Sequence, residues 1–359
     1  MDWGKLKKKY IGLDLFRVIS VMTVCAFHTT IHLGANYGIL QYVSKMGAVF
    51  MTAFFMLSGF SLFVNYAGKD IIKIDNLKTF WIKRIIGIIP MYYIASLLHI
   101  IFKFGEETMI QEILLAPIEV LCIQSNFSSL FSFTHNGGTW FISCIMMCYL
   151  IYPLLQEISK QLSTKNKLFI IALSSFLLLY SPIIVWKFNV ADIYSNPFFR
   201  ILEFSIGVMI AALKPTFDET KVIKKYVYNW VSIVIIAVLM MIGITVGIKR
   251  GIFVGNYMMY NWICLPCFIF ILAGISGVES KVLEHSKLLA YCSSISYVFF
   301  LAQLFSNHIC KWINEKYTIT NNLTIIALGW SVCIIISIGF HEIMEKPINK
   351  ALNKKCFSK

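Results

Sequence analysis

Apolar runs of membrane-spanning length dominate this chain of 359 residues. A helix crosses the hydrocarbon core of a bilayer with about 20 predominantly apolar residues, whereas a barrel strand needs only about half as many. About ten such runs are present, at residues 10–33, 46–66, 80–103, 139–156, 167–187, 197–214, 229–249, 257–275, 286–310 and 323–342. The sequence therefore predicts an all-α fold, a polytopic membrane helix bundle with about ten transmembrane helices. We expect residues 1–359 to form a single membrane-embedded domain without a separate soluble domain.

Charged side chains are too sparse to cover a water-soluble globule. Only 14% of the residues are charged, against about a quarter in soluble domains, so the lipid bilayer is the expected partner of most side chains. The formal net charge is +14. With a cytoplasmic N-terminus, the inside segments hold 23 of the 32 Lys and Arg residues and the outside segments hold 7, while Arg17 and Arg200 lie within spans. This positive-inside bias predicts that both termini are cytoplasmic and that no nucleic acid is bound.

Cysteine usage and overall composition give two further expectations. The ten cysteines are scattered and mostly lie inside apolar runs. Cys264 and Cys267 have the spacing of one half of a redox or zinc site, but the sequence offers no second half for such a site. We therefore expect packing roles for them and no metal site.

The chain is rich in Ile, Lys and Asn, a composition typical of low-GC bacteria. We expect a multi-pass protein of the cell membrane, in a bacterial cytoplasmic membrane.

The first apolar run carries three ionisable residues, Asp14, Arg17 and His28. Ionisable side chains at membrane depth are costly and indicate functional sites. On a helix, Arg17 and His28 lie about 20° apart around the axis and about 16 Å apart along it, and Asp14 projects from the same stripe. One interpretation is an interfacial ion pair of Asp14 and Arg17, with His28 as a buried hydrogen-bonding residue. The other is the wall of a polar cavity that extends from the cytoplasm, in which His28 acts as a general base.

Seven short motifs follow one another along the chain. They are Asp14-Leu-Phe-Arg17 with ten residues before His28; Phe54-Phe-Met-Leu-Ser58-Gly59-Phe60; Phe80-Trp-Ile-Lys83-Arg84 with Pro90; Trp140-Phe-Ile-Ser143 leading to Tyr152-Pro153; Arg200-Ile-Leu-Glu203-Phe-Ser-Ile-Gly207; Ser296-Tyr297; and Glu345-Lys346-Pro347. In this order they resemble the acyltransferase-3 family of multi-pass membrane acyltransferases. One departure is visible, because that family often has a histidine in the penultimate span where this chain has Gln303. An amide forms hydrogen bonds but cannot titrate, so a proton-transfer role at this position is lost.

The resemblance implies a membrane-bound O-acyltransferase. Such an enzyme transfers an acyl group, usually acetyl, from cytoplasmic acyl-CoA to a hydroxyl of an extracytoplasmic glycan or lipid-linked sugar. His28 would remove the acceptor proton or relay the acyl group itself, with Arg17 and Asp14 in the same catalytic set. Arg17 is also suited to stabilising the developing oxyanion. The phosphates of the donor, acetyl-CoA, would pair with Arg84, Arg17 and Lys83, although positive-inside anchoring also accounts for Lys83 and Arg84.

Further motif residues are candidate contacts for the acceptor, and each has a structural alternative. They are Arg200, Glu203, Trp140, Tyr297 and Ser58. Arg200 and Glu203 are three residues apart, a spacing that also suits a mutual salt bridge. Ser58 stands beside Gly59, so it fits small-residue packing as well as nucleophilic catalysis. Trp140 and Tyr297 are equally consistent with interfacial or core aromatic residues.

A second class of function fits the same intramembrane charges. An exporter or flippase for a cell-surface polysaccharide or a lipid-linked sugar would line its substrate route with such residues and carry out no chemistry. Acyl-CoA turnover distinguishes the two classes. The oligomeric state is open, and a homo-oligomer is one option.

Overall fold

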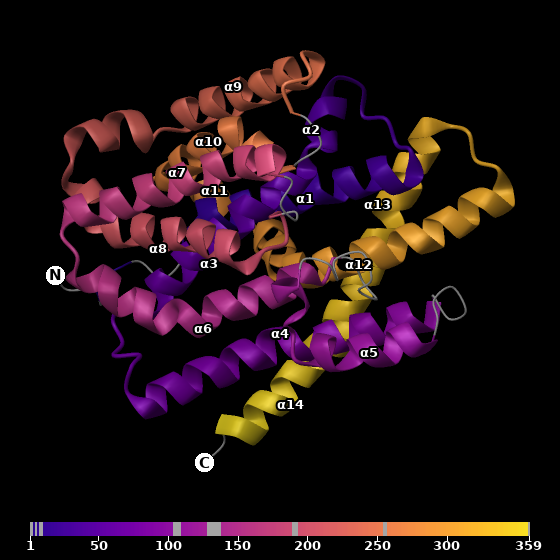
Figure 1. Cartoon of the computed structure of the whole chain (residues 1–359), viewed down its shortest axis with the longest axis horizontal. Coiled ribbons are helices and arrows are strands. Elements are labelled where there is room, and N and C mark those ends of the chain that lie inside the picture. Colours follow the sequence, from indigo (N-terminus) through magenta and orange to yellow (C-terminus); the bar gives the residue numbers. More distant parts are fainter. Residues whose placement is uncertain are drawn as a thin grey trace.

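The computed structural model describes residues 3, 6, 10–102, 109–127, 138–188, 193–253 and 257–357. Within these residues every regular element is a helix (Figure 1). The long helices are α1 (Ile11–Leu33), α3 (Phe50–Tyr66), α4 (Ile74–Phe102), α6 (Trp140–Gln161), α7 (Thr164–Phe188), α8 (Pro197–Glu219), α9 (Trp230–Lys249), α10 (Asn261–Ile275), α12 (Lys287–Tyr317) and α13 (Asn322–Gly339). The short ones are α2 (Gln41–Lys45), α5 (Met109–Val120), α11 (Lys281–Glu284) and α14 (Lys346–Phe357).

Nine helices in the described part of the chain are long and apolar enough to cross a membrane. This confirms the predicted polytopic helical bundle. The helix of the remaining predicted range, α8, is not among the nine, because Arg200, Glu203 and Lys214 make it more polar. It contacts α3, α6, α7 and α10, and every residue from Glu203 to Lys214 is buried. The side chains of Arg200, Glu203 and Lys214 are therefore surrounded by protein.

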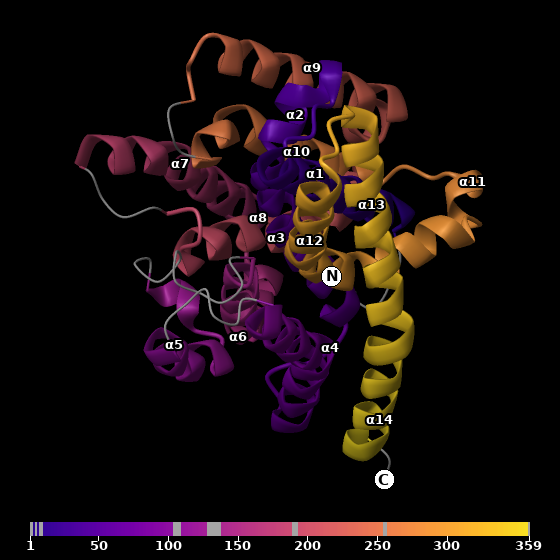
Figure 2. The ribbon, with the colours of Figure 1, turned by 90° about the vertical axis from the view of Figure 1, so that its right-hand side faces the viewer.

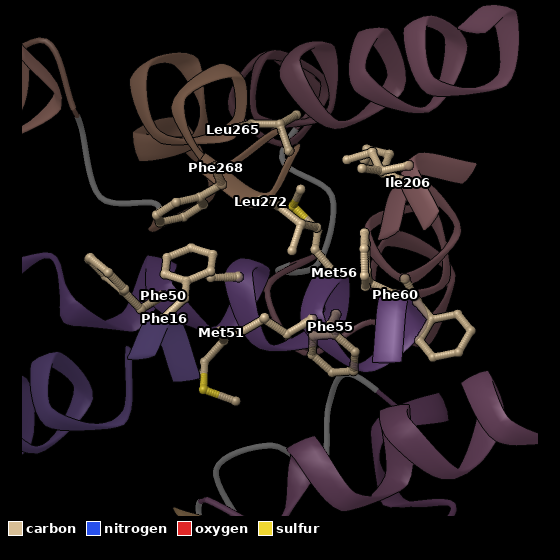
Figure 3. Packing of buried hydrophobic residues seen from close by; sticks show 14 of the residues in the cluster. Phe16, Phe50, Met51, Phe55, Met56, Phe60, Ile206, Leu265, Phe268 and Leu272 are labelled. Carbon is tan, nitrogen blue, oxygen red and sulfur yellow. The ribbon is translucent and has the colours of Figure 1, made fainter. Parts of the chain in front are cut away.

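The backbones of α3 and α8 are in direct contact. A Cβ atom added to Gly207 would lie 1.9 Å from the carbonyl oxygen of Met56, and one added to Gly59 would lie 2.1 Å from that of Phe204. Small residues permit such close approach where van der Waals packing holds membrane helices together. Gly59 therefore serves helix packing. The buried side chains around this contact, shown in Figure 3, include Phe55, Phe60, Ile206, Leu265 and Leu272.

The first helix contacts both α3 and α12, and α12 packs in turn against α13. A π-helical turn, Phe340–Glu345, joins α13 to α14, and the three segments form one column along an edge of the molecule (Figure 2). In Figure 1 both chain ends lie in the left half and the connection between α12 and α13 lies at the far right. Both termini thus lie toward one end of the bundle, and the cytoplasmic assignment of that end stays a prediction.

Candidate functional site

Two adjoining cavities lie among α1, α3, α4 and α6, and α12 also lines the inner one. The inner cavity has a volume of about 250 Å³ and the outer cavity about 640 Å³. Both are lined by Arg17, Ser58, Lys83, Arg84 and Tyr149, so the two spaces are neighbours. The outer cavity is also lined by Ser61, Asn65, Tyr66 and Lys69, and the inner cavity by Met51, Phe54, Gly87, Phe141, Tyr297 and Phe300.

Arg17 is held at the cavity wall by three helices. Its Nη1 donates to Asp14 Oδ1 at 3.2 Å and to Ser293 Oγ at 2.9 Å, and its Nη2 donates to Ser61 Oγ at 3.4 Å. Ser293 Oγ in turn donates to Asp14 Oδ1 at 2.7 Å. The Arg17 side chain keeps 27% of its surface exposed. The predicted Asp14–Arg17 ion pair therefore forms, and the guanidinium also faces an open space.

Arg84 carries a positive charge that no carboxylate of the described residues neutralises. Its Nη2 lies 3.5 Å from the hydroxyl of Tyr66, and its guanidinium lies 5.8 Å from the ring centroid of Tyr66 and 5.9 Å from that of Tyr149. Its buried Nε has no hydrogen-bond partner among these residues. Lys83 contacts the ring of Phe357 and likewise has no ion pair within the described part of the chain. The inner cavity thus combines three cations, Arg17, Lys83 and Arg84, with one nearby carboxylate, and the outer cavity adds Lys69 as a fourth cation.

His28 lines neither of these cavities. Val21 and Val24 lie within about 40° of Arg17 around the helix axis and occupy the stripe between Arg17 and His28, with exposures of 4% and 2%. The imidazole of His28 stacks on that of His32 with centroids 5.6 Å apart, and its buried Nδ1 has no hydrogen-bond partner among the described residues. The stripe predicted from helical periodicity is thus polar at both ends and apolar in the middle.

Gln303, the residue where the family resemblance predicts a histidine, lies against this apolar stretch. Its Nε2 donates to the carbonyl oxygen of Val21 at 3.3 Å, and the side chain is only 1% exposed. Its buried Oε1 has no partner within the described residues. The amide therefore joins α12 to α1 at the depth that separates Arg17 from His28.

Ser58 and Tyr297 are the predicted acceptor residues that reach the inner cavity. The hydroxyl of Tyr297 donates to the carbonyl oxygen of Ile88 at 2.8 Å, which joins α12 to α4. Ser58 lies one residue before the packing contact of Gly59 on α3. Both residues therefore lie beside the three cations, at the site predicted for the donor.

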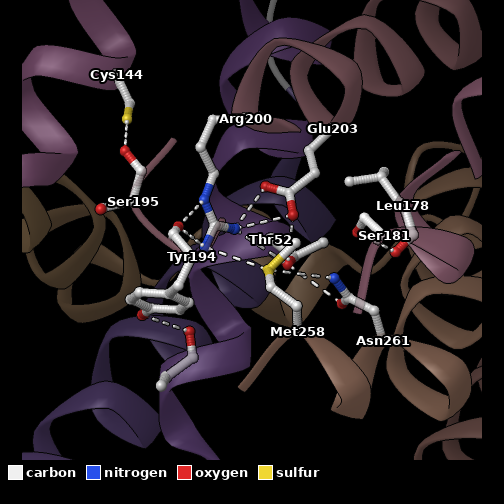
Figure 4. Close-up of polar contacts among 11 residues, drawn as sticks. Thr52, Cys144, Leu178, Ser181, Tyr194, Ser195, Arg200, Glu203, Met258 and Asn261 are labelled. Carbon is white, nitrogen blue, oxygen red and sulfur yellow. Dashed lines mark hydrogen bonds and ion pairs between the residues drawn. The ribbon is translucent and has the colours of Figure 1, made fainter. Parts of the chain in front are cut away.

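The other three acceptor candidates lie elsewhere: Arg200 and Glu203 in the closed polar cluster of Figure 4, and Trp140 beside it. Arg200 and Glu203 are both 0% exposed, and Arg200 Nη1 donates to both Glu203 oxygens at 2.9 Å. Arg200 Nε donates to the carbonyl oxygen of Tyr194 at 2.8 Å, and Thr52 Oγ1 donates to Glu203 Oε1 at 2.8 Å. The guanidinium lies 5.0 Å from the Trp140 ring centroid. The mutual salt bridge is therefore formed, and none of these residues lines either cavity.

Some cavity residues were missed although the sequence carried a signal for them. Phe141, Ile145 and Tyr149 line the inner cavity, and their spacing of four residues places them on one face of α6. Tyr66 and Gly87 carry no comparable signal, because their roles depend on the approach of α3 to α4.

Sequence comparisons place these features in a known family. A model of the acyltransferase-3 family, described as an acyltransferase domain, matches residues 10–342. This chain belongs to the acyltransferase-3 family. Acyltransferase MdmB of Streptomyces mycarofaciens is 24% identical over 196 residues, which are 49% of this chain and 49% of that relative. The chain therefore aligns with about half the length of that relative, and no solved structure matches it significantly. The chain therefore carries an acyltransferase domain of this family, together with the membrane-length apolar helices of a multi-pass protein.

Proposed function

We propose that this acyltransferase transfers a short acyl group, acetyl in the first instance, from acyl-CoA to a hydroxyl of an extracytoplasmic glycan or lipid-linked sugar. The observation that carries the proposal is the unneutralised charge of Arg84, beside Arg17 and Lys83, on a cavity at membrane depth. Arg84 is partly buried, and its buried Nε lacks a hydrogen-bond partner among the described residues, which is a cost that a bound hydrogen-bond acceptor would remove. A phosphorylated donor supplies the missing negative charge and bonds well to guanidinium groups.

The length of the cavity also suits this donor. Tyr149 beside Arg84 and Phe141 at the far end of the inner cavity are eight residues apart on α6, which is about 12 Å along the helix. The pantetheine arm of CoA, with a backbone equivalent to about four extended residues, is roughly 15 Å long. With its phosphates at Arg84, Arg17 and Lys83, the donor would bring its thioester into the inner cavity.

The reaction moves one acyl group and one proton. The acceptor hydroxyl oxygen attacks the thioester carbonyl carbon, the bond between carbon and sulfur breaks, and CoA leaves as a thiolate. His28 accepts the hydroxyl proton, which then neutralises the thiolate. Alternatively, a ring nitrogen of His28 attacks the thioester carbonyl carbon and releases the thiolate; the hydroxyl oxygen then takes the acyl group from this nitrogen, and the hydroxyl proton neutralises the thiolate. In either version the apolar stretch at Val21 and Val24 must open, because His28 lies outside the donor cavity.

Replacing Arg84 by glutamine is expected to weaken acyl-CoA binding about 10–100-fold, the loss for a charge-assisted hydrogen bond of about 1.5–3 kcal/mol. The measurement is the dissociation constant of acetyl-CoA and of free CoA, with the purified protein in lipid nanodiscs. The matched control is Lys78→Gln, which removes an exposed cation from the same helix and should leave the affinity unchanged. Equal affinities for the wild type and the Arg84→Gln variant would refute the donor site.

Filling the inner cavity at Gly87 provides a second test that removes no charge. A Cβ atom on Gly87 meets no atom within 4 Å, and the residue lines the inner cavity. Gly87→Leu is expected to lower CoA affinity at least about tenfold, because the leucine side chain would occupy the path of the pantetheine arm. Gly87→Ala should preserve folding, since alanine favours a helix over glycine by roughly 0.5–1 kcal/mol. Gly339→Leu is the control, because that helical glycine also has open space around its Cβ. Normal CoA binding by Gly87→Leu would contradict this route.

A measurement of acyl-CoA turnover distinguishes an acyltransferase from an exporter. Purified protein in nanodiscs is supplied with radiolabelled acetyl-CoA and a mixture of cell-surface glycans. Release of CoA together with label on a glycan supports acyl transfer. Glycan movement across proteoliposomes without CoA release would favour the exporter and end the proposal.

A further inference from the structure

The inner cavity changes from cationic to apolar along its length. On α3 it passes from Ser58 to Phe54 and Met51, and on α12 from Ser296 to Phe300. On α6 it passes from Tyr149 to Phe141. These three helices therefore place apolar side chains at the end of the cavity that lies away from Arg17, Lys83 and Arg84.

Three aromatic rings close this apolar end. The ring centroids of Phe141 and Phe300 are 5.3 Å apart, and those of Phe54 and Phe141 are 6.5 Å apart. The same rings pack against the core clusters that contain Val21 and Val24. A linear group that enters from the cationic end therefore meets these aromatic rings at the apolar end of the cavity.

We infer that Phe54, Phe141 and Phe300 form the acyl-chain pocket of the donor site and limit the length of the acyl group. This inference rests on the proposed function, since it places the thioester at the end of the inner cavity. The pocket has no cation of its own, because Lys83 and Arg84 lie at the opposite end. A neutral, short acyl chain fits it, whereas the terminal carboxylate of a succinyl group would be buried without a partner.

Removing an aromatic ring should lengthen the accepted chain. In Phe300→Ala and Phe141→Ala, each methylene that enters the new space should raise relative affinity about fourfold. We therefore expect the ratio of hexanoyl-CoA to acetyl-CoA affinity to rise about 10–100-fold over the wild type. Phe300→Leu is the milder variant, used if either alanine variant fails to fold, and it should shift the ratio in the same direction by a smaller factor.

The matched control is Phe305→Ala. Phe305 is a partly buried phenylalanine of α12, like Phe300, but it packs near Phe340 and lines neither cavity. Phe305→Ala removes a ring of the same size as Phe300→Ala does. It should leave the ratio of hexanoyl-CoA to acetyl-CoA affinity unchanged.

The experiment measures displacement of radiolabelled CoA by acetyl-, butyryl-, hexanoyl-, octanoyl- and succinyl-CoA from purified protein in nanodiscs. Free CoA serves as the reference for every variant. A raised preference for longer chains at Phe300 or Phe141, with unchanged affinity for free CoA, supports the inference. An unchanged preference for acyl-chain length in folded variants that still bind free CoA would overturn this inference and leave the proposed function standing. Failure of the wild type to bind any CoA species would instead overturn the proposed function and the inference with it.

Discussion

His28→Ala is expected to lower the rate of acyl transfer about 10²–10⁴-fold, the usual contribution of a general acid or base, without weakening acyl-CoA binding. The imidazole lies beyond the apolar stretch of α1, and its buried Nδ1 has no hydrogen-bond partner among the described residues. It lines neither donor cavity, so donor affinity should be independent of it. The measurement is CoA release and glycan labelling under single-turnover conditions, beside a separate binding measurement.

His32→Ala is the matched control for that experiment. His32 stacks on His28 with an interplanar angle of 10° but is exposed near the end of α1. Its loss should change the rate far less than the loss of His28. Full activity of a folded His28→Ala protein would end the catalytic assignment. Loss of donor binding in that variant would show instead that the donor extends past Val21 and Val24.

Glu203→Ala is expected to lower the free energy of unfolding by about 3–5 kcal/mol, the cost of leaving a buried charge without its partner. Arg200 would keep its bonds to Tyr194, Thr52 and Met258 but would lose its carboxylate partner in a site where it is 0% exposed. The double variant Arg200→Met with Glu203→Leu should lose less stability than Glu203→Ala, because it leaves no unpaired charge. Equilibrium unfolding of the purified proteins in mixed detergent micelles measures both values.

Glu342→Ala is the control for the buried pair. Glu342 bonds to Lys346 at the surface, where an ion pair contributes little, so this variant should unfold like the wild type. Wild-type stability of Glu203→Ala with a selective loss of acceptor use would contradict the structural role. That outcome would restore the interpretation of Arg200 and Glu203 as acceptor contacts.

The motif residues lie in different parts of the molecule, and their spacing along each helix does not predict where each of them lies. Arg17, Lys83 and Arg84 meet because α1 and α4 line the same cavity, and Tyr66 and Tyr149 complete the site from α3 and α6. The ion pairs Asp14–Arg17 and Arg200–Glu203 were predictable, since residues three apart are neighbours on any helix. That the first pair faces a cavity and the second is enclosed depends on Tyr194, Thr52 and the close contact of α3 with α8.

The sequence alone determined the membrane-spanning helical class, the local ion pairs and the family resemblance, because hydropathy, short-range spacing and motif order are properties of the chain itself. Only the tertiary structure decided what lies between Arg17 and His28. Periodicity places both on one stripe of α1, but the neighbouring helices determine whether water or side chains cover that stripe. Here Gln303 and the packing around Val21 and Val24 cover its middle. The donor cavity and the imidazole are consequently separated by apolar side chains that the spacing of residues on α1 does not reveal.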